Sequence, residues 1–365
     1  MNTIDDNFVE GVKKFLNTLS KNQFEFKPVQ KGSTKSGTSL NLGFSCYAIK
    51  ILHIIREFDT RDDKSEWIDY INNFQTSNFK KFPSNSFIDE NYVKSFNRNP
   101  LLVNFKYILK KYLKPQRYKP KSEVLNEFIL AETKQAISTL KQIGSNNRSN
   151  YFSNFLQEDK LQQYIDTLDW STPWTSGAQL ANLMFILETQ KNENSENLKQ
   201  IFQKTVDNLA DAKTGMYFKG TIKNEAEIIN GAMKIISGMD WLNLEIHYPK
   251  KIIDFCLNHS PKNFGCDIVD LVYVIYKSSK QLNNSYKYIE INEYFNDILK
   301  KIYENYFPDL GGFSYFKNKS QIHYYGVKIS KGFDEPDIHG TLLLLWAISM
   351  ISDFRNENTF NILKP

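Results

Sequence analysis

The sequence is poor in cysteine, and its few cysteines form no recognisable framework. Among 365 residues there are three, Cys46, Cys256 and Cys266, and no two of them form a CxxC pair. Secreted domains that depend on disulfides carry more cysteines at short spacings. We therefore expect free thiols and a reducing, cytoplasmic environment.

Long apolar runs are also missing. The longest, Leu342–Ile351, is interrupted by Ser349 and falls short of the roughly 18 residues that a membrane span needs. The first residues, Met1–Asp6, are acidic and lack the basic and apolar regions of a signal peptide. These absences predict no membrane span and agree with a cytoplasmic location.

No charge of one sign dominates, since 46 basic and 41 acidic side chains leave a net charge of +5. A field this weak argues against nucleic acid as a partner. The motifs GxxxxGK[ST], GxGxxG, HExxH and GxSxG are absent, so P-loop, dinucleotide-binding, zinc-protease and nucleophile-elbow hydrolase classes have no support. With 41% hydrophobic and 14% aromatic residues, the chain still has enough apolar side chains for a large core.

Helical periodicity is what the sequence does contain. Apolar residues recur at i, i+3, i+4 and i+7 almost throughout, whereas strict alternation is rare, which predicts an all-α protein. Residues 4–19 form the first amphipathic helix, with one apolar stripe of Phe8, Val12, Phe15, Leu16 and Leu19. Residues 30–40 are rich in Gly, Ser, Thr and Lys and are expected to form a loop.

A repeat is visible in the helices that follow. Six of them open with small or polar residues and then become apolar, at residues 45–48, 132–136, 176–180, 230–233, 266–270 and 337–341. Between them lie amphipathic segments at 67–74, 161–168, 198–209, 250–257 and 291–306. Turns with glycine and aromatic residues, such as 211–217 and 308–313, join members of the two sets. The repeat unit is therefore an outer helix, a turn and an inner helix.

The clearest unit is Gly311-Gly312-Phe313-Ser314-Tyr315, a polar loop, and then the apolar helix that starts at Asp337-Ile338-His339-Gly340-Thr341. This unit resembles the repeats of the α/α toroid superfamily, which contains squalene and terpenoid cyclases and protein prenyltransferase β subunits. The resemblance covers residues 40–355 as a pattern and is specific over about the last 50. It implies an (α/α)6 toroid of inner and outer helices over residues 41–365, with a helix and loop in 1–40 added at the N-terminus.

In such a toroid the inner helices point their N-terminal ends towards one end of a central cavity, and polar residues in their first turns would meet there. The sequence offers pairs spaced so that both members lie on one helix face, for example Asn230 with Lys234. The predicted substrate-binding residues are Glu132, Gln135, Gln179, Asn230, Asp267, Asp270, His323 and Tyr324.

The densest cluster of ionisable residues is Asp334-Glu335-Pro336-Asp337-Ile338-His339. Several carboxyl groups beside an imidazole can supply a general acid whose pKa is raised by burial and like charge. We therefore predict Glu335, Asp337 and His339, together with Tyr325, as the catalytic residues.

The family's mechanisms transfer only in part. The Asp-x-Asp-Asp acid motif of the cyclases is missing. His339 and Asp270 resemble two zinc ligands of the prenyltransferases, but Val272 stands where their cysteine would be, and Cys266 or Asp267 lies one turn away. We therefore expect no metal and no other cofactor.

The sequence thus predicts an enzyme with a central aromatic cavity and acid/base chemistry, which by resemblance acts on an isoprenoid-type small molecule. One alternative is a carbohydrate-active toroid, either a hydrolase or a lyase, that acts on an oligosaccharide. Another is a toroid that binds a protein or polymer without catalysis, with a shallow bowl and no carboxyl group of raised pKa.

Overall fold

The protein is mostly α-helical, as the periodicity predicts. The structure is a computed structural model that describes residues 6–98, 119–190, 194–222 and 224–365. In these ranges the strands have two residues each and occur in three antiparallel pairs. The expected first helix is α1 (Asp6–Leu19), and Ile4, which we had placed in it, lies outside the described residues. All five residues of its apolar stripe are buried.

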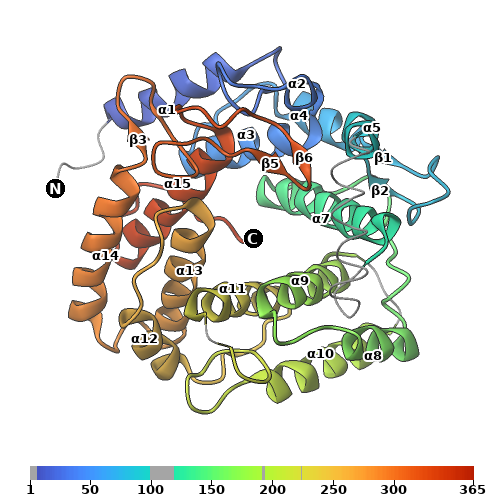
Figure 1. The fold of residues 1–365 in the computed structure, drawn as a ribbon, viewed down its shortest axis with the longest axis vertical. Helices are drawn as coiled ribbons and strands as arrows, with labels where there is room; N and C mark the ends of the chain where they lie inside the picture. Colours follow the sequence, from blue (N-terminus) through green and yellow to red (C-terminus); the bar gives the residue numbers. More distant parts are fainter. Residues whose placement is uncertain (1–5, 99–118, 191–193, 223) are drawn as a thin grey trace.

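All six predicted inner helices are present. They are α3 (Leu42–Ile54), α7 (Lys121–Gln142), α9 (Pro173–Thr189), α11 (Glu225–Trp241), α13 (Gly265–Gln281) and α15 (Ile338–Phe354). Each packs on the next in chain order, and α15 packs on α3, so their contacts form a closed cycle. Figure 1 shows these helices arranged around the C-terminus of the chain.

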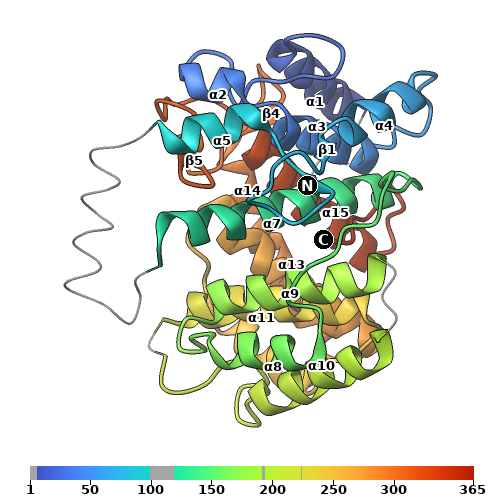
Figure 2. The ribbon, with the colours of Figure 1, turned by 90° about the vertical axis from the view of Figure 1, so that its right-hand side faces the viewer.

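The second set of helices lies outside this cycle (Figures 1 and 2). It comprises α4 (Lys64–Asn72), α8 (Glu158–Asp166), α10 (Ser195–Leu209), α12 (Pro249–Leu257) and α14 (Tyr288–Tyr303). Of these, α12 packs on α13, and α14 packs on both α13 and α15. The alternation of inner and outer helices along the chain agrees with the repeat unit read from the sequence.

A glycine allows the inner helices α9 and α11 to pack closely together. Gly231 of α11 faces the start of α9, where a Cβ atom would lie 2.5 Å from Cβ of Pro173. Any other residue at this position would therefore force the two helices apart. This contact gives a packing reason for the small residues that mark the predicted helix openings.

Three local features differ from the prediction. The helix expected to open near Glu132 begins at Lys121, so Glu132 lies in the middle of α7 and not at its end. The loop predicted for residues 30–40 contains the short helix α2 (Lys35–Ser39). Helix α5 (Glu90–Asn97) was not predicted. Short-range composition suggested loops here, but cap residues and tertiary contacts stabilise single helical turns.

The six strands form three small hairpin-like pairs. These are β1 (Gln75–Thr76) with β2 (Ser86–Phe87), β3 (Tyr306–Phe307) with β4 (Gly312–Phe313), and β5 (His323–Tyr324) with β6 (Val327–Lys328). The segment between β4 and α15 includes the β5–β6 pair and lies at the N-terminal end of α15. It is the polar loop of the repeat unit described above.

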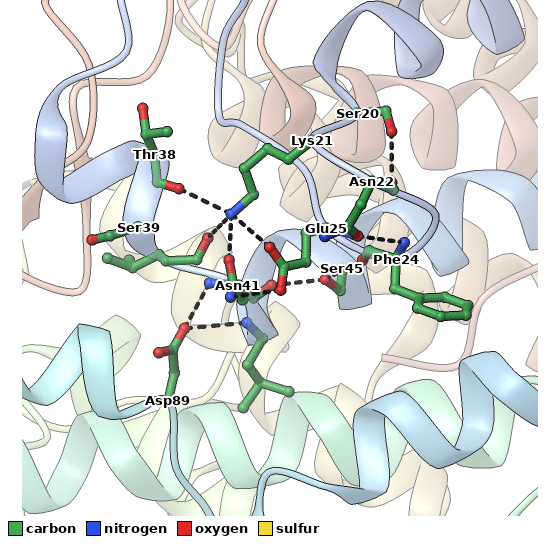
Figure 3. Close-up of polar contacts among 12 residues, drawn as sticks. Ser20, Lys21, Asn22, Phe24, Glu25, Thr38, Ser39, Asn41, Ser45 and Asp89 are labelled. Carbon is green, nitrogen blue, oxygen red and sulfur yellow. Dashed lines mark hydrogen bonds and ion pairs between the residues drawn. The ribbon is translucent and has the colours of Figure 1, made fainter.

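A polar cluster fixes the N-terminal segment to the start of α3 (Figure 3). Nζ of Lys21 donates to the carbonyl oxygen of Thr38 at 2.9 Å and pairs with Glu25 at 3.4 Å. Asp89 accepts from the backbone N–H of Asn41 at 2.6 Å and of Leu42 at 3.2 Å. Its other oxygen accepts from two N–H groups at the start of α5, so one carboxylate caps two helices.

Within the described ranges, no helix combines the length and the apolar character that crossing a membrane requires.

Candidate functional site: a cavity between the inner helices

A cavity of about 430 Å³ lies between the inner helices. All six helices contribute to its wall, as do the polar loop before α15 and the last residues of the chain. The wall includes polar, ionisable and apolar side chains. They are Tyr47 and Lys50 from α3, Lys134 and Gln135 from α7, Asn182 from α9, Met233 and Lys234 from α11, Cys266, Val269 and Asp270 from α13, Tyr315, Gln321, Tyr324 and Tyr325 from the loop, and His339, Leu342, Leu343 and Trp346 from α15.

The C-terminal segment closes the cavity at the end where the inner helices terminate. Leu363 and Pro365 are part of its wall. The indole N–H of Trp241 donates to the carbonyl oxygen of Pro365 at 2.5 Å, and Nζ of Lys364 lies 4.5 Å from the centre of the Trp241 ring system. The segment is therefore held by specific contacts to α11.

Three lysines from three different helices line the cavity. Nζ of Lys50 donates to Oγ of Ser138 at 2.9 Å, and Nζ of Lys234 lies 3.5 Å from Oδ1 of Asp270. Nζ of Lys134 lies 5.6 Å from the centre of the Phe185 ring. With three amines and one side-chain carboxylate, the ionisable side chains of this wall carry an excess of positive charge when all are ionised.

Burial makes two of these amines easier to deprotonate. It lowers the pKa of Lys50 to about 8. It also lowers the pKa of Lys134 to about 7, and the positive charges of Lys50 and Lys234 add to this effect. Both amines therefore titrate close to neutral pH, far below an exposed lysine. A bound anion would favour their charged forms.

Asp270 is the acidic group of the cavity. It is buried, and burial raises its pKa to about 6, although Lys234 opposes the shift. Its Oδ2 atom has no hydrogen-bond partner among the described residues. A carboxyl group with this pKa can give or take a proton near pH 7.

His339 is held between two tyrosine rings. Its ring centre lies 4.7 Å from that of Tyr47, with 4° between the planes, and 5.4 Å from that of Tyr315, with 21° between the planes. Burial, with a smaller effect from Lys234, lowers the pKa of His339 to about 3. The imidazole is therefore neutral at pH 7, and its Nδ1 atom has no partner among the described residues.

Tyr324 joins the cavity wall to the predicted residue Glu132. Its hydroxyl donates to Oε1 of Glu132 at 3.1 Å, and Oε2 of Glu132 has no partner in the described part of the chain. Glu132 is buried behind the cavity wall, and burial raises its pKa well above the usual value. Tyr325, which also lines the cavity, has a φ of +40° and stacks on Phe128. The two adjacent tyrosines thus face the cavity from the β5–β6 turn.

Asp337 positions the loop that carries other cavity residues. One of its oxygens accepts from Gly340 N–H at 2.7 Å and caps α15. The other accepts from the N–H groups of Tyr315 at 2.7 Å and Gln321 at 3.1 Å, and both of these residues line the cavity. Gly340 permits this approach, because a Cβ atom there would lie 2.4 Å from the Tyr315 nitrogen.

Burial raises the pKa of Asp337 to about 7. The residue does not line the cavity, however, and both of its oxygens are used by backbone donors. Its position therefore differs from the one expected of a catalytic acid.

Glu335 also lies away from the cavity. Its two oxygens accept from the N–H groups of Lys31 at 2.8 Å and Gly32 at 2.7 Å, so it joins the N-terminal segment to the loop before α15. Of the four residues predicted to be catalytic, Tyr325 and His339 line the cavity, whereas Glu335 and Asp337 do not. Both carboxylates accept hydrogen bonds from nearby backbone N–H groups instead, and Asp337 does so at the start of α15, where acidic residues are favoured.

The predicted binding residues fall into two groups. Gln135, Asp270 and Tyr324 line the cavity. Five others do not: Glu132 accepts from Tyr324 behind the wall, Gln179 bonds to Glu127 and Tyr164, Asn230 bonds to Asp267, Asp267 accepts from Lys262 N–H, and His323 is exposed. In three pairs predicted to share a helix face, one member lines the cavity and the other does not: Gln135 but not Glu132, Lys234 but not Asn230, and Asp270 but not Asp267. Spacing along a helix therefore did not predict which residues meet the cavity.

Several polar atoms of the wall are left without partners. Within the described ranges these include Oδ2 of Asp270, Nδ1 of His339, Oε1 of Gln321 and Nε1 of Trp346. Each such buried atom costs about 1–3 kcal/mol unless something pairs with it. Unpaired polar atoms on an otherwise largely apolar wall are typical of a ligand site.

The arrangement of the cavity residues does not support a zinc site. Cys266, Asp270 and His339 all line the cavity. Yet among the residues that the structure describes, no three His, Cys, Asp or Glu side chains are grouped so that they could hold a metal ion.

Sequence reasoning missed Lys50 and Lys134 as site residues. A sequence feature could have identified them, because each lysine lies within a predicted inner helix. An example is Lys50 in Cys46-Tyr47-Ala48-Ile49-Lys50-Ile51-Leu52. A charge in the buried part of an apolar helix needs a partner or a cavity.

Comparisons of the chain with protein families, with characterised proteins and with solved structures find no match. The chemistry of the cavity therefore carries the functional argument.

Proposed function

We propose that this protein is an enzyme of the α/α toroid type that binds an anionic substrate with an apolar body in its central cavity, and that a prenyl diphosphate is the substrate class that fits best. One observation carries the proposal: three half-buried lysines from three inner helices line one cavity with an apolar and aromatic wall.

The toroid assignment is supported by the closed cycle of contacts among the six inner helices. It is also supported by the cavity, to which all six contribute. The outer helices pack on the inner set, as the repeat unit requires.

The anionic end of the substrate is inferred from the unfavourable free energy of placing several charged lysines in one cavity. An amine whose pKa falls to about 7 or 8 on burial is destabilising when charged. Asp270 is the one side-chain carboxylate on the described cavity wall, and it faces three amines. A diphosphate would supply the missing negative charge and accept several hydrogen bonds.

The apolar end is inferred from the remaining wall. Val269, Leu342, Leu343 and Trp346 come from the neighbouring helices α13 and α15 and lie beside the stacked rings of His339 and its tyrosines. A volume of about 430 Å³ is within the usual range for small-molecule sites. Aromatic faces can also stabilise a cation formed when the diphosphate leaves.

Acid/base chemistry is assigned to Asp270 in place of Glu335 and Asp337. Asp270 lines the cavity, has an unpaired oxygen and titrates near neutral pH. His339, which is neutral at this pH, would orient the substrate through Nδ1. Tyr324, with Glu132 behind it, is the second proton donor on the wall.

An acidic carbohydrate is the second candidate. Lysines can neutralise a uronate carboxylate, and adjacent tyrosines on the wall can act in an elimination, so the lyase form of this alternative has support. The hydrolase form needs a pair of carboxyl groups across the site, and Asp270 is the single carboxylate of the described cavity wall. A non-catalytic bowl has less support, because it would not need a carboxyl group of raised pKa.

Binding of four probes to the full chain tests the proposal. They are farnesyl diphosphate, farnesol, inorganic diphosphate and a uronate oligosaccharide, each followed by calorimetry and thermal unfolding. We expect farnesyl diphosphate to bind at least 10-fold more tightly than farnesol or inorganic diphosphate. At 100 times its Kd it should stabilise the protein by about 2.7 kcal/mol. Mass spectrometry of the incubated substrate then tests for turnover.

Lys234→Met is the informative variant, and Lys300→Met is its control. Lys300 is an exposed residue of α14 that pairs only with Asp297 among the groups that the structure describes. Lys234→Met should weaken binding at least 10-fold, and Lys300→Met should leave it unchanged. Tight binding of the uronate alone would favour the second candidate. Equal binding by both variants would overturn the assignment of the cavity as an anion site.

A further inference from the structure

Lys134 differs from the other two lysines of the cavity. Lys50 donates to Ser138, and Lys234 is paired with Asp270. Among the described residues the amine of Lys134 has no hydrogen-bond acceptor and no ion-pair partner, and it lies over the face of Phe185, 5.6 Å from the ring centre. Lys134 therefore lines the cavity, and within the described ranges the weak attraction of an aromatic face is the contact that favours its charged form.

The surroundings of this amine favour its neutral form. Burial and the two neighbouring lysines act in the same direction on its pKa, which falls to about 7. About half of the Lys134 side chains then carry a free electron pair at pH 7. For an exposed lysine this is about one side chain in a few thousand. A desolvated amine beside other cations is a known way to make lysine a nucleophile.

We propose that Lys134 forms an imine with an aldehyde or ketone that binds in the cavity through its own anionic group. The inference rests on the proposed anion site for the charged end of the ligand and adds a covalent activity to it. The remaining cavity lysines, Lys50 and Lys234, would bind the anionic group.

The reaction is balanced without an oxidant or a reductant. The electron pair of Nζ attacks the carbonyl carbon, and the C=O π electrons move to oxygen. A proton passes from nitrogen to that oxygen to give a carbinolamine. The C–O bond then breaks, water leaves with a second proton, and the C=N bond forms. Asp270 faces the same cavity and can supply and accept these protons.

Reductive trapping tests the proposal. The full chain is incubated at pH 7 with glyoxylate, an anionic aldehyde, and sodium cyanoborohydride, which reduces an imine to a stable amine. Modified lysines are then located by peptide mass spectrometry. We expect Lys134 to be modified at least 10-fold faster than the exposed Lys300. Modification of Lys134 at the rate of Lys300 or slower would overturn the proposal.

The Lys50→Met variant tests whether the charge of Lys50 controls the reactivity of Lys134. A lysine with a purely structural role would not change the pH dependence of trapping. Removing this neighbouring charge should raise the pKa of Lys134, so the pH at which trapping reaches half its maximum rate should move upwards. Trapping that stays unchanged in this variant would contradict the role of Lys50 and, with it, the proposed cause of the reactivity.

Lys134→Arg separates this inference from the proposed function. Arginine keeps the positive charge but forms no imine under these conditions, so trapping in the cavity should disappear while binding of farnesyl diphosphate is retained better than in Lys134→Met. If farnesyl diphosphate does not bind the wild-type chain but Lys134 is still trapped rapidly, the imine chemistry stands and the prenyl diphosphate assignment fails.

Discussion

The imidazole of His339 lies almost parallel to the ring of Tyr47, with 4.7 Å between ring centres and 4° between planes. The two residues come from α15 and α3, which are far apart in sequence and adjacent in the cycle of inner helices. Tyr315 covers the other face of the imidazole. The stack therefore joins the first and last inner helices to the polar loop at the cavity.

This stack predicts different results for two substitutions of His339. His339→Phe keeps an aromatic ring between the tyrosines and should change the free energy of unfolding by less than about 1 kcal/mol. His339→Ala should cost about 1–3 kcal/mol, because it removes both ring contacts and leaves a gap. Urea unfolding measures the difference. Both variants lose Nδ1, so both should bind farnesyl diphosphate more weakly; unchanged binding by His339→Phe would exclude a polar role.

The pKa of Lys134 predicts how binding depends on pH. An anion needs the charged amine, and this amine loses its proton as the pH rises through about 7. Arginine stays charged throughout this range. The affinity of the wild type for farnesyl diphosphate, divided by that of Lys134→Arg, should therefore fall by about 10-fold between pH 6.5 and 8.5. A flat ratio in calorimetry would show that Lys134 does not contribute charge to the site.

The same lysines predict an unusual dependence of stability on pH. Their pKa values are lower in the folded protein than in the unfolded chain, so between pH 7 and 8.5 the unfolded chain binds more protons. Stability should therefore increase with pH in this window through these two groups. In the double variant Lys50→Met with Lys134→Met this increase should be smaller, by on the order of 1–2 kcal/mol.

The window ends near pH 8.5 for a physical reason. Burial raises the pKa of the thiols of Cys46, to about 12, and of Cys266, to about 11, so these groups oppose the lysines once an unfolded thiol would ionise. The measurement is urea unfolding of the wild type and the double variant at pH 7.0 and 8.5. A double variant with the same pH slope as the wild type would contradict the lowered pKa values.

Asp337 should affect the fold rather than the chemistry. Asp337→Ala removes the acceptor of three backbone N–H groups and should cost about 2–4 kcal/mol in unfolding free energy. Asp337→Asn keeps one acceptor for Gly340 and should cost about 1–2 kcal/mol. Where the Asn variant is folded, its turnover of the substrate should stay within a few-fold of the wild type. A loss of 100-fold or more with an intact fold would restore Asp337 as a catalytic acid.

Asp89 offers a matched test of stability away from the cavity. Its carboxylate accepts N–H groups at the starts of α3 and α5 (Figure 3), so Asp89→Ala should lower the free energy of unfolding by about 2–3 kcal/mol. Asp89→Asn should be intermediate. Because this residue does not line the cavity, binding of farnesyl diphosphate should be unchanged while the variant remains folded.

The sequence by itself determined the helical class and the succession of inner and outer helices. Apolar residues at helical spacing and small residues such as Gly231 act through neighbours on the same or the adjoining helix, so their effect can be read locally. The sequence also predicted His339 as a site residue, and His339 lies in the first turn of α15 and lines the cavity.

Only the tertiary structure decided which ionisable groups meet. Lys50, Lys134 and Lys234 lie on three helices separated by long stretches of chain, and no local pattern specifies that they face one cavity. In contrast, Glu335 and Asp337 are adjacent to the predicted site in sequence but turn to nearby backbone donors. Charge, burial and pKa depend on groups brought together from all six inner helices, which is why the site could not be assigned from spacing along the chain.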